Sequence, residues 1–527
     1  MNLLDWLIII FYSGGLLLIG YHFSKSQKDT SDYFLAGRSF GWFPIALSTM
    51  ATQLSAISFI SAPAFVGLRE NGGLKWLSFE FAVPLAMIFL MYVIIPPLYK
   101  ANVVSIYGFL EERFGLSTRL IISLVFQFSR AFATGISVYA LAIVLSAVLG
   151  IPIWITIIIA GVVTLIYSTL GGMKAVVYTD VIQMIILLIG IFLCGWVGLK
   201  ELGGLQNFIS NVDRSRLMAV NFSDIGIGKG SEFGFLPMVI GGFFLYASYY
   251  GCDQTQAQRA LTGKNFNEVK TALLVNGLFR FPITLSYCLV GLIIGTFALM
   301  NSHFLNLIPK DKTDYMIPIF IINFMPNGLI GILIVAILSA AMSSLSSTMN
   351  SLAAVAVEDL IIRRKSVKIS DEKYVKYSRW FTIFWGFVCI GVAFLAGNIA
   401  STVIEAINKV GSLFYGPILA TFILAILSKK VNATAVNIGL ISGVAFNFLL
   451  WIFAENFIFW FWWNFTGAAI TIIFALMSMK IIKNKKPQNI PSHKEKTPLF
   501  YLETLTLIGY FIFIVALSFS LHFLIPN

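Results

Sequence analysis

The stretch from Ala336 to Ser351, AILSAAMSSLSSTMNS, carries many hydroxyl groups although it lies inside a longer apolar run. In a helix that turns about 100° per residue, one face of this stretch presents Ala340, Ser343, Ser344 and Ser347. Hydroxyl groups that faced lipid would lack hydrogen-bond partners, so this face must meet protein, water or an ion. Two interpretations fit: a seam of small residues where helices pack closely, or a site where neutral oxygens bind a largely dehydrated cation.

Two other apolar segments contain polar residues at depths that a membrane helix rarely tolerates. Residues 42–68 include MATQLSAISFISAP, with Gln53 and Ser55 near the middle, and residues 236–262 include YASYYGCDQTQAQR, with Asp253. Each segment begins a group of five apolar spans. Polar or glycine-containing interruptions at matching places in two halves are typical of inverted-repeat transporters, whose broken helices offer free backbone carbonyls.

The composition is that of a polytopic membrane protein. Apolar residues make up 58% of the 527 residues and charged residues only 11%, whereas soluble domains carry about 25% charge. The mean hydropathy is +0.87. The net charge of +12 does not indicate a nucleic-acid partner, because the charges sit in short loops between apolar spans.

The chain shows no pattern typical of an enzyme or of a resident cofactor. Its four cysteines lie in apolar segments without CxxC spacing, and its four histidines are widely scattered. It contains no HExxH motif. We therefore expect free core thiols, no zinc or haem site, no organic cofactor and no catalytic activity.

The apolar runs predict about fourteen membrane spans. They begin near residues 3, 42, 76, 118, 152, 176, 236, 270, 328, 377, 402, 434, 457 and 502. The first run has no basic leader, so we expect a retained helix and not a cleaved signal. Basic residues concentrate in alternate loops, above all in 363–379 and 480–496, which predicts that these loops are cytoplasmic. Both termini are then outside, and the chain is a multi-pass protein of the plasma (inner) membrane. The aromatic run Phe459–Phe465 is predicted to form an interfacial belt.

Several motifs resemble the sodium/solute symporter family. They are DYFLAGRS (Asp32–Ser39), GGMKAVVYTDVIQ (Gly171–Gln183), QTQAQR in the seventh span, and the serine-rich helix that ends in AAVAVEDL. The resemblance covers about residues 3–430. That family includes sodium-coupled glucose, sialic acid, iodide, monocarboxylate and multivitamin transporters. The resemblance implies an all-α LeuT-type fold, in which ten core helices form two inverted five-helix repeats.

With this fold, residues 1–527 form a single transmembrane transporter domain. An extra N-terminal helix (3–22) precedes repeat 1 (42–199) and repeat 2 (236–428), and peripheral helices occupy 434–525.

The resemblance also implies that sodium is the coupling ion. The family's principal sodium site combines backbone carbonyls of the first core helix with an alanine carbonyl and two hydroxyls of the eighth. The matching residues are Ala51, Leu54, Ala340, Ser343 and Ser344. Some members have a second sodium site with further hydroxyls and an aspartate. The matching residues are Asp180, Ser343, Ser346 and Ser347. Asp180 alone also fits a helix-end cap, so one and two coupling ions are both open at this point.

The solute is expected beside the sodium, between the two broken helices. The candidate residues are Gln53, Ser55, Ser58, Phe79, Glu80, Tyr246, Tyr249, Arg280 and Asn408. In sugar-transporting relatives a similar set binds hydroxyls around a tyrosine, but here Tyr246 and Ser58 replace two amide side chains. Glu80 alternatively forms a structural ion pair with Arg280 or Arg130, and a carboxylate solute would use either arginine.

We therefore expect a sodium-coupled symporter that imports a small organic solute, best matched by a sugar, polyol or sugar acid. The alternatives are a sodium-coupled transporter of monocarboxylates, other anions or vitamins, and a proton-coupled symporter in which Asp180 or Glu80 carries the proton. The expected partners are sodium ions, the solute and the lipid bilayer, with no nucleic acid.

Overall fold

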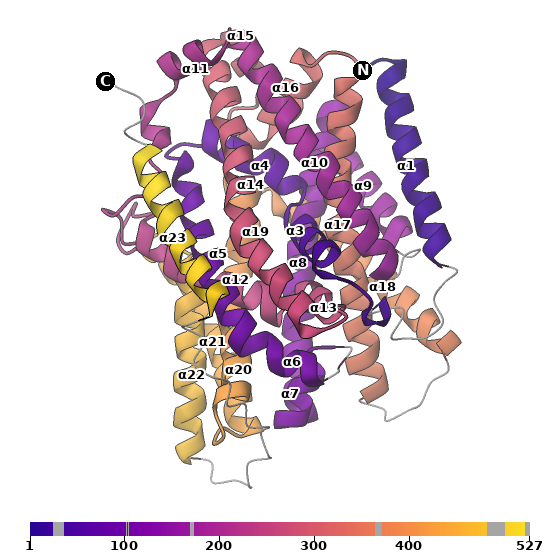
Figure 1. Ribbon diagram of the computed structural model, residues 1–527, viewed down its shortest axis with the longest axis vertical. Helices are drawn as coiled ribbons and strands as arrows, with labels where there is room; N and C mark the ends of the chain where they lie inside the picture. Colours follow the sequence, from indigo (N-terminus) through magenta and orange to yellow (C-terminus); the bar gives the residue numbers. More distant parts are fainter. Residues whose placement is uncertain are drawn as a thin grey trace.

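The computed structural model describes residues 1–24, 36–101, 103, 105–168, 173–363, 371–481 and 501–521. These residues form helices and loops, and their β-type pairing is limited to two isolated bridges. Figure 1 shows the helices bundled along the long axis of the molecule, with the start of α1 (Leu3–Ser24) and the end of α23 (Leu502–Leu521) toward the same end.

The helices form two groups in chain order, and each group starts with a broken helix. The first group comprises α3 (Trp42–Gln53) with α4 (Ala56–Gly67), a segmented span of η2 (Leu74–Phe81), α5 (Ala82–Phe89), η3 (Leu90–Ile94) and α6 (Ile95–Ala101), and then α8 (Leu116–Leu149), α9 (Ile153–Ser168) and α10 (Met173–Glu201). The second group comprises α12 (Phe235–Cys252) with α13 (Gln254–Leu261), α14 (Phe266–Met300), α17 (Leu329–Val355) with η6 (Ala356–Arg363), α18 (Asp371–Ala396), and α19 (Val403–Ser412) with α20 (Tyr415–Leu427).

The remaining elements are peripheral helices and short connections. The peripheral helices are α1, α21 (Ala433–Ala454), α22 (Trp462–Ile481) and α23. The connections contain η1 (Ala36–Arg38), α7 (Tyr107–Phe114), α11 (Leu205–Asn211), η4 (Arg214–Leu217), α15 (Ser302–Leu307), η5 (Thr313–Tyr315) and α16 (Met316–Phe324).

The number of spans in the described residues is lower than the predicted number. Eleven helices are long and apolar enough to cross a membrane, or twelve when the bent pair α3–α4 is one span. The other two predicted spans correspond to α1 and α9, whose described apolar stretches, Leu3–Gly15 and Ile153–Val162, are shorter.

The serine-rich helix α17 lies inside the bundle. It packs against α10, α8, α1 and α3, and Ser343 and Ser347 are only 1% and 2% exposed. Its start is held by Asp5 of α1, whose Oδ1 accepts hydrogen bonds from the backbone N–H groups of Gly328 (2.8 Å) and Gly331 (2.9 Å). The serine face therefore meets protein and not lipid, as its hydrogen-bonding capacity requires.

A break that the apolar pattern did not predict interrupts the span of α19 and α20 between Ser412 and Tyr415. Such a break leaves backbone carbonyls without helical donors. The side-chain amide of the buried Asn447 on α21 donates to the carbonyls of Ser412 (3.2 Å) and Leu413 (3.1 Å). The peripheral helices therefore satisfy backbone groups of the core.

The prediction of an interfacial belt at Phe459–Phe465 is wrong for the middle of that run. Phe461 and Trp463 are fully buried. The ring of Phe461 lies 5.6 Å from that of Phe79 and 6.5 Å from that of Trp76 on η2. These side chains pack over η2. Aromatic rings stabilise the packing of helices as well as the contact with a lipid headgroup layer, so the aromatic composition alone did not distinguish the two.

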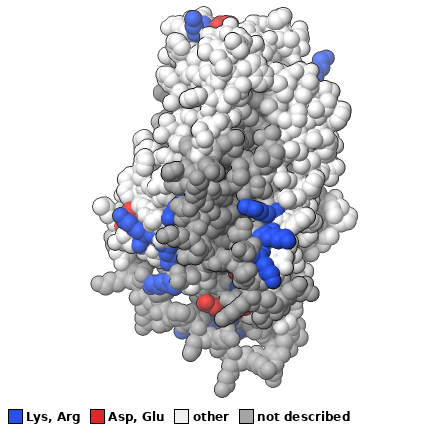
Figure 2. Space-filling view, turned by 90° about the vertical axis from the view of Figure 1, so that its right-hand side faces the viewer, with Lys and Arg blue, Asp and Glu red and all other residues white. Residues whose placement is uncertain are grey.

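Charged side chains are unevenly distributed along the bundle. On the face shown in Figure 2, the described lysine and arginine side chains gather mostly in the lower half, and the upper half is largely free of charged side chains. Basic residues favour the cytoplasmic side of a membrane, so this distribution supports the predicted orientation, which stays a prediction.

Candidate functional site

The first broken helix bends by 55° between α3 and α4. At the break, the backbone N–H of Ser55 donates to the carbonyl of Gln53 (3.1 Å), and the N–H of Ser58 donates to the carbonyl of Ser55 (3.0 Å). In a continuous helix these N–H groups would bond the carbonyls of Ala51 and Leu54, four residues earlier. The break therefore releases the two carbonyls that the family resemblance implies for the principal sodium site.

The serine face of α17 meets this break. The hydroxyl of Ser344 donates to the carbonyl of Thr52 at 2.9 Å, and the carbonyl of Ala340 lies 3.3 Å from the same hydroxyl. The hydroxyl of Ser343, one position earlier, donates to Oδ1 of Asp180 on α10. The structure thus brings Ala340 and Ser344 to the break and directs Ser343 toward the predicted second site.

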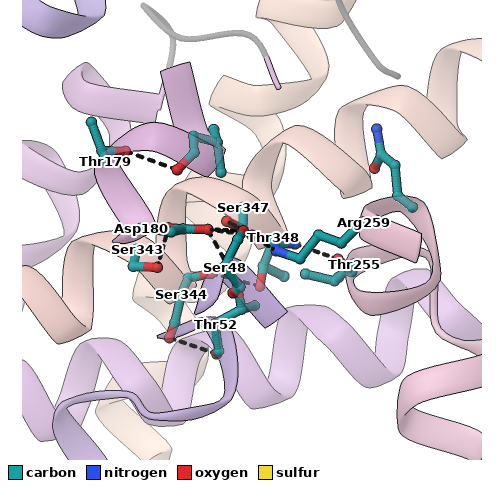
Figure 3. Close-up of polar contacts among 12 residues, drawn as sticks. Ser48, Thr52, Thr179, Asp180, Thr255, Arg259, Ser343, Ser344, Ser347 and Thr348 are labelled. Atoms are coloured by element: carbon teal, nitrogen blue, oxygen red, sulfur yellow. Dashed lines mark hydrogen bonds and ion pairs between the residues drawn. The ribbon is translucent and has the colours of Figure 1, made fainter. Parts of the chain in front are cut away.

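The predicted second sodium site is a buried polar cluster (Figure 3). Oδ2 of Asp180 accepts hydrogen bonds from the hydroxyl of Ser48 on α3 (2.5 Å) and from Nη2 of Arg259 on α13 (3.0 Å). The same Nη2 donates to the hydroxyl of Ser347 at 2.6 Å. Arg259 thus connects Asp180 with Ser347, whereas the side chain of Ser346 lies outside the described part of the structure.

Arg259 is the functional candidate that the sequence did not reveal. It belongs to the QTQAQR motif at the end of a predicted span, where a basic residue would be expected to reach the loop. Instead, Arg259 is 1% exposed and forms an ion pair with Asp180. Among the described residues no group of three or more His, Cys, Asp and Glu side chains could hold a metal ion, so the cation ligands on offer are hydroxyl, carbonyl and single carboxylate oxygens.

A cavity lies beside the first break. Its empty space is about 610 Å³ when the open space at its mouth is included. The predicted solute residues on its wall are Gln53, Ser55, Ser58, Phe79, Tyr246, Tyr249, Arg280 and Asn408. The wall also contains Arg130, which was expected to bind the solute only if the solute is a carboxylate. The other wall residues, which were not expected at the solute site, are Ile57, Leu245, Tyr287, Ile404, Ile407 and Tyr415.

Glu80, the remaining predicted solute residue, lies behind Arg280. Its carboxylate accepts hydrogen bonds from Nε (3.1 Å) and Nη2 (3.0 Å) of Arg280 and from the hydroxyl of Thr284 (2.9 Å). Glu80 is fully buried. In this arrangement it orients the guanidinium of Arg280 toward the cavity, and Nη1 of Arg280 has no hydrogen-bond partner among the described residues.

The second break positions the other arginine of the cavity. Asp253 separates α12 from α13, and its side chain accepts a hydrogen bond from the backbone N–H of Thr255 (2.8 Å), which caps α13. Asp253 also forms an ion pair with Nε of Arg130 at 2.5 Å. The guanidinium of Arg130 donates to the hydroxyl of Tyr415 (2.7 Å) and lies 4.9 Å from the ring centre of Tyr249.

An ion pair joins the turn after α4 to α19. Nη2 of Arg69 lies 2.7 Å from Oε1 of Glu405 and 3.2 Å from Oε2 of Glu232. Beside it, Oδ2 of Asp314 in η5 accepts a hydrogen bond from the backbone N–H of Val403 (3.0 Å) at the start of α19. Burial raises the pKa of the Asp314 carboxyl to about 6.

Comparison with known sequences places these features in a family. A sequence model of the sodium:solute symporter family matches residues 33–443. The putative sodium-dependent multivitamin transporter of Drosophila melanogaster is 32% identical over 448 residues, which cover 81% of this chain and 70% of the relative. The sodium-coupled monocarboxylate transporter 1 of Xenopus laevis is 31% identical over 436 residues, 81% of this chain and 67% of the relative. The sodium/sialic acid symporter NanT of Aliivibrio fischeri is 27% identical over 490 residues, 91% and 94% of the two chains.

Solved structures share the fold. A substrate-bound, outward-open Na⁺-coupled sialic acid symporter superposes with a TM-score of 0.82 at 24% identity, over 92% of this chain and 100% of that chain. The nucleobase-cation-symport-1 transporter Mhp1, closed with bromovinylhydantoin bound, has a TM-score of 0.56 at 13% identity, over 92% and 99%. The predicted LeuT-type fold is confirmed.

Proposed function

Because the chain belongs to the sodium:solute symporter family, we propose that it uses the sodium gradient to import a sugar, polyol or sugar acid by alternating access. The observation that carries the proposal is the break at Leu54 and Ser55, which frees the carbonyls of Ala51 and Leu54 beside the hydroxyl of Ser344. Neutral oxygens at a helix break are the ligands that transporters of this architecture use for sodium.

The principal sodium ion binds to the carbonyls of Ala51, Leu54 and Ala340 and to the hydroxyls of Ser343 and Ser344. Ser343 rotates from Asp180 to reach this ion. The cavity wall shares Gln53 and Ser55 with the break, so solute and sodium occupy adjacent positions. Binding of one therefore favours the conformation that binds the other.

A second sodium ion, at Asp180, Ser343, Ser346 and Ser347, would change the energy available for transport. One ion moving through 100 mV releases about 2.3 kcal/mol, and a tenfold gradient adds about 1.4 kcal/mol. One ion thus supports accumulation of several hundredfold and two ions of about 10⁵-fold.

The wall chemistry favours a solute with both hydroxyl and acidic groups. Phe79 and Tyr246 stack at 5.4 Å and offer an aromatic surface, and the amides of Gln53 and Asn408 supply donors and acceptors for hydroxyls. Glu80 and Asp253 balance the charges of the two arginines on the same wall, and Nη1 of Arg280, which has no hydrogen-bond partner among the described residues, can donate to one carboxylate oxygen. The sialic acid symporter among the relatives supports this choice of solute.

A monocarboxylate or vitamin is the alternative solute, and relatives of both kinds support it. A thermal-shift screen of the purified protein in sodium separates these classes, because a ligand that binds the folded state raises its apparent stability. N-acetylneuraminate, glucose, inositol, lactate and pantothenate are compared at equal concentration. A shift with lactate or pantothenate and none with the sugars or the sugar acid would overturn the sugar-acid proposal.

A proton-coupled mechanism is the alternative coupling. It would use Asp180 or Glu80, and both carboxylates are ion-paired to arginines in this structure, which disfavours a freely exchanging proton. Solute uptake into proteoliposomes is measured with external sodium replaced by choline, at pH 6 and pH 8. Sodium coupling predicts uptake only in sodium at both pH values, whereas uptake in choline at pH 6 would contradict it.

A further inference from the structure

The cluster around Asp180 already contains a cation, the side chain of Arg259. We propose that the guanidinium of Arg259 holds the place of the second sodium ion as a tethered cation, so that sodium reaches Asp180 only by displacing it. This inference rests on the sodium-coupled function proposed above, and it concerns how the second ion site works.

Arg259 uses two of the four predicted ligands of the second sodium ion, Asp180 and Ser347. Its Nη2 bonds both Oδ2 of Asp180 (3.0 Å) and the hydroxyl of Ser347 (2.6 Å). Its Nε bonds the hydroxyl of Ser48 (2.8 Å), and its Nη1 bonds the carbonyl of Thr255 (2.5 Å). In Figure 3 the side chains of Asp180, Ser347 and Ser48 meet at the point that the end of the Arg259 side chain occupies. An ion bound to Asp180 and Ser347 would occupy the same point.

The charge of the buried site also indicates that it holds either the guanidinium of Arg259 or a sodium ion, but not both. Asp180 is fully buried and Arg259 is 1% exposed, so the pair is neutral and largely out of water. Adding sodium while Arg259 stays would leave a net positive charge in a buried site, which is strongly unfavourable. Exchanging one monovalent cation for the other leaves the charge of the site unchanged.

Replacement of Arg259 by sodium at Asp180 would also remove contacts that hold α13 in place. In this structure Arg259 connects α13 to Ser48 of α3, Asp180 of α10 and Ser347 of α17. A sodium ion would keep α10 and α17 together through its ligands but would release α13 from them. Sodium binding at Asp180 thereby acts on the broken helix that also positions Asp253 and Arg130 at the solute cavity. This gives the second ion a mechanical link to the solute.

Equilibrium binding of ²²Na⁺ to the purified full-length chain tests the competition. The assay is run at pH 8.5, where few protons compete with sodium for the carboxylate of Asp180. The variants are Arg259→Gln, Arg259→Lys, Asp180→Asn and the double variant Arg259→Gln/Asp180→Asn. Two binding phases are expected, a stronger one from the principal site and a weaker one from the second site. Arg259→Gln removes the guanidinium, so the weaker phase should occur at a sodium concentration at least tenfold lower, or should become measurable where it was not.

The other variants supply the controls. Lysine keeps the charge but loses the fork that reaches Asp180, Ser347 and Ser48 together, so Arg259→Lys is expected to shift the weaker phase in the same direction by at least threefold. Asp180→Asn and the double variant are expected to lack that phase and to keep the stronger phase of the principal site.

The outcomes separate this inference from the proposed function. If Arg259→Gln leaves the weaker phase unchanged or weakens it while the stronger phase is intact, competition is disproved. If Arg259→Gln does not fold, Arg259→Lys decides in the same way. If neither the native chain nor any of the variants binds sodium, the proposed sodium-coupled function itself is wrong.

Discussion

The hydroxyl of Ser344 donates a hydrogen bond to the carbonyl of Thr52 at 2.9 Å, at the point where α3 ends. This contact joins the serine-rich helix to the broken helix within one turn of the released carbonyls of Ala51 and Leu54. Helix α17 and the break therefore form one site, and the function of each depends on the other.

Removal of the Ser344 hydroxyl should weaken sodium binding. Ser344→Ala deletes one oxygen ligand of the ion. A hydrogen bond to a charged group contributes about 1.5–3 kcal/mol, and we expect a loss of binding free energy of similar size. The sodium concentration for half-maximal uptake should rise at least tenfold. Ser339→Ala on the same helix is the control, because Ser339 contacts Tyr12 of α1 instead (2.5 Å). Equal sodium dependence in Ser344→Ala and the native chain would exclude Ser344 as a ligand.

The pair of Glu80 and Arg280 should be needed for folding as well as for solute binding. Glu80→Ala leaves a buried guanidinium without its carboxylate, and such a loss costs about 3–5 kcal/mol. The apparent unfolding temperature in detergent should fall steeply, and Glu80→Ala/Arg280→Met should recover stability without recovering transport. Glu201→Gln, at an exposed position, serves as the control. An unchanged unfolding temperature in Glu80→Ala would show that the pair does not stabilise the fold.

The ion pair of Arg69 and Glu405 should restrict access to the cavity. Ser58, which lies on the cavity wall, can be replaced by cysteine, and the four native cysteines are buried. In this background Glu405→Gln should speed modification by an impermeant thiol reagent about tenfold. Glu232→Gln should have a smaller effect, because Glu232 is 48% exposed and surface pairs contribute little. Identical modification rates in all three proteins would show that the pair is not a barrier.

Asp314 should make stability depend on pH. Burial raises its pKa from 3.8 to about 6, aided by the charge of Glu405 and opposed by hydrogen bonds from Ser61 and the backbone of Val403. The folded state thus binds the proton more tightly than the unfolded state, so this contribution is complete below pH 3.8 and is lost as the pH rises through 6.

Between pH 7.5 and pH 5 the gain should be about 1.4 kcal/mol, the equivalent of one pKa unit. Thermal unfolding at the two pH values measures it, and Asp314→Asn should remove this part of the pH dependence. The same pH dependence in Asp314→Asn and in the native chain would assign the effect to other groups.

The breaks after Gln53 and at Asp253 and the serine face could be predicted from the sequence because lipid tolerates few exceptions. Polar residues such as Gln53 and Asp253 within apolar runs have no place in an unbroken lipid-facing helix, so their positions indicate where the backbone leaves helical geometry. The spacing of Ser343, Ser344 and Ser347 likewise determines a single face, and the structure buries that face.

The partners of charged residues could not be predicted in the same way. A long arginine side chain reaches groups on several helices, and the sequence does not show which neighbour is closest. Arg259, at the end of a predicted span, was therefore expected near the loop although it pairs with Asp180. For Glu80 the sequence left solute binding and an ion pair with Arg280 or Arg130 both open, and the structure shows the pair with Arg280. The buried run around Phe461 shows the same limit, since an aromatic cluster has the same composition in a helix interface and in a membrane interface.

The most direct test of the account is sodium binding by the double variant Ser343→Ala/Ser344→Ala. Purified native chain is expected to bind ²²Na⁺ in a saturable strong phase, and the double variant to lose that phase while unfolding at a temperature close to that of the native chain. Sodium binding by the double variant with the affinity of the native chain would contradict the claim that the serine hydroxyls and the broken helix hold the coupling ion.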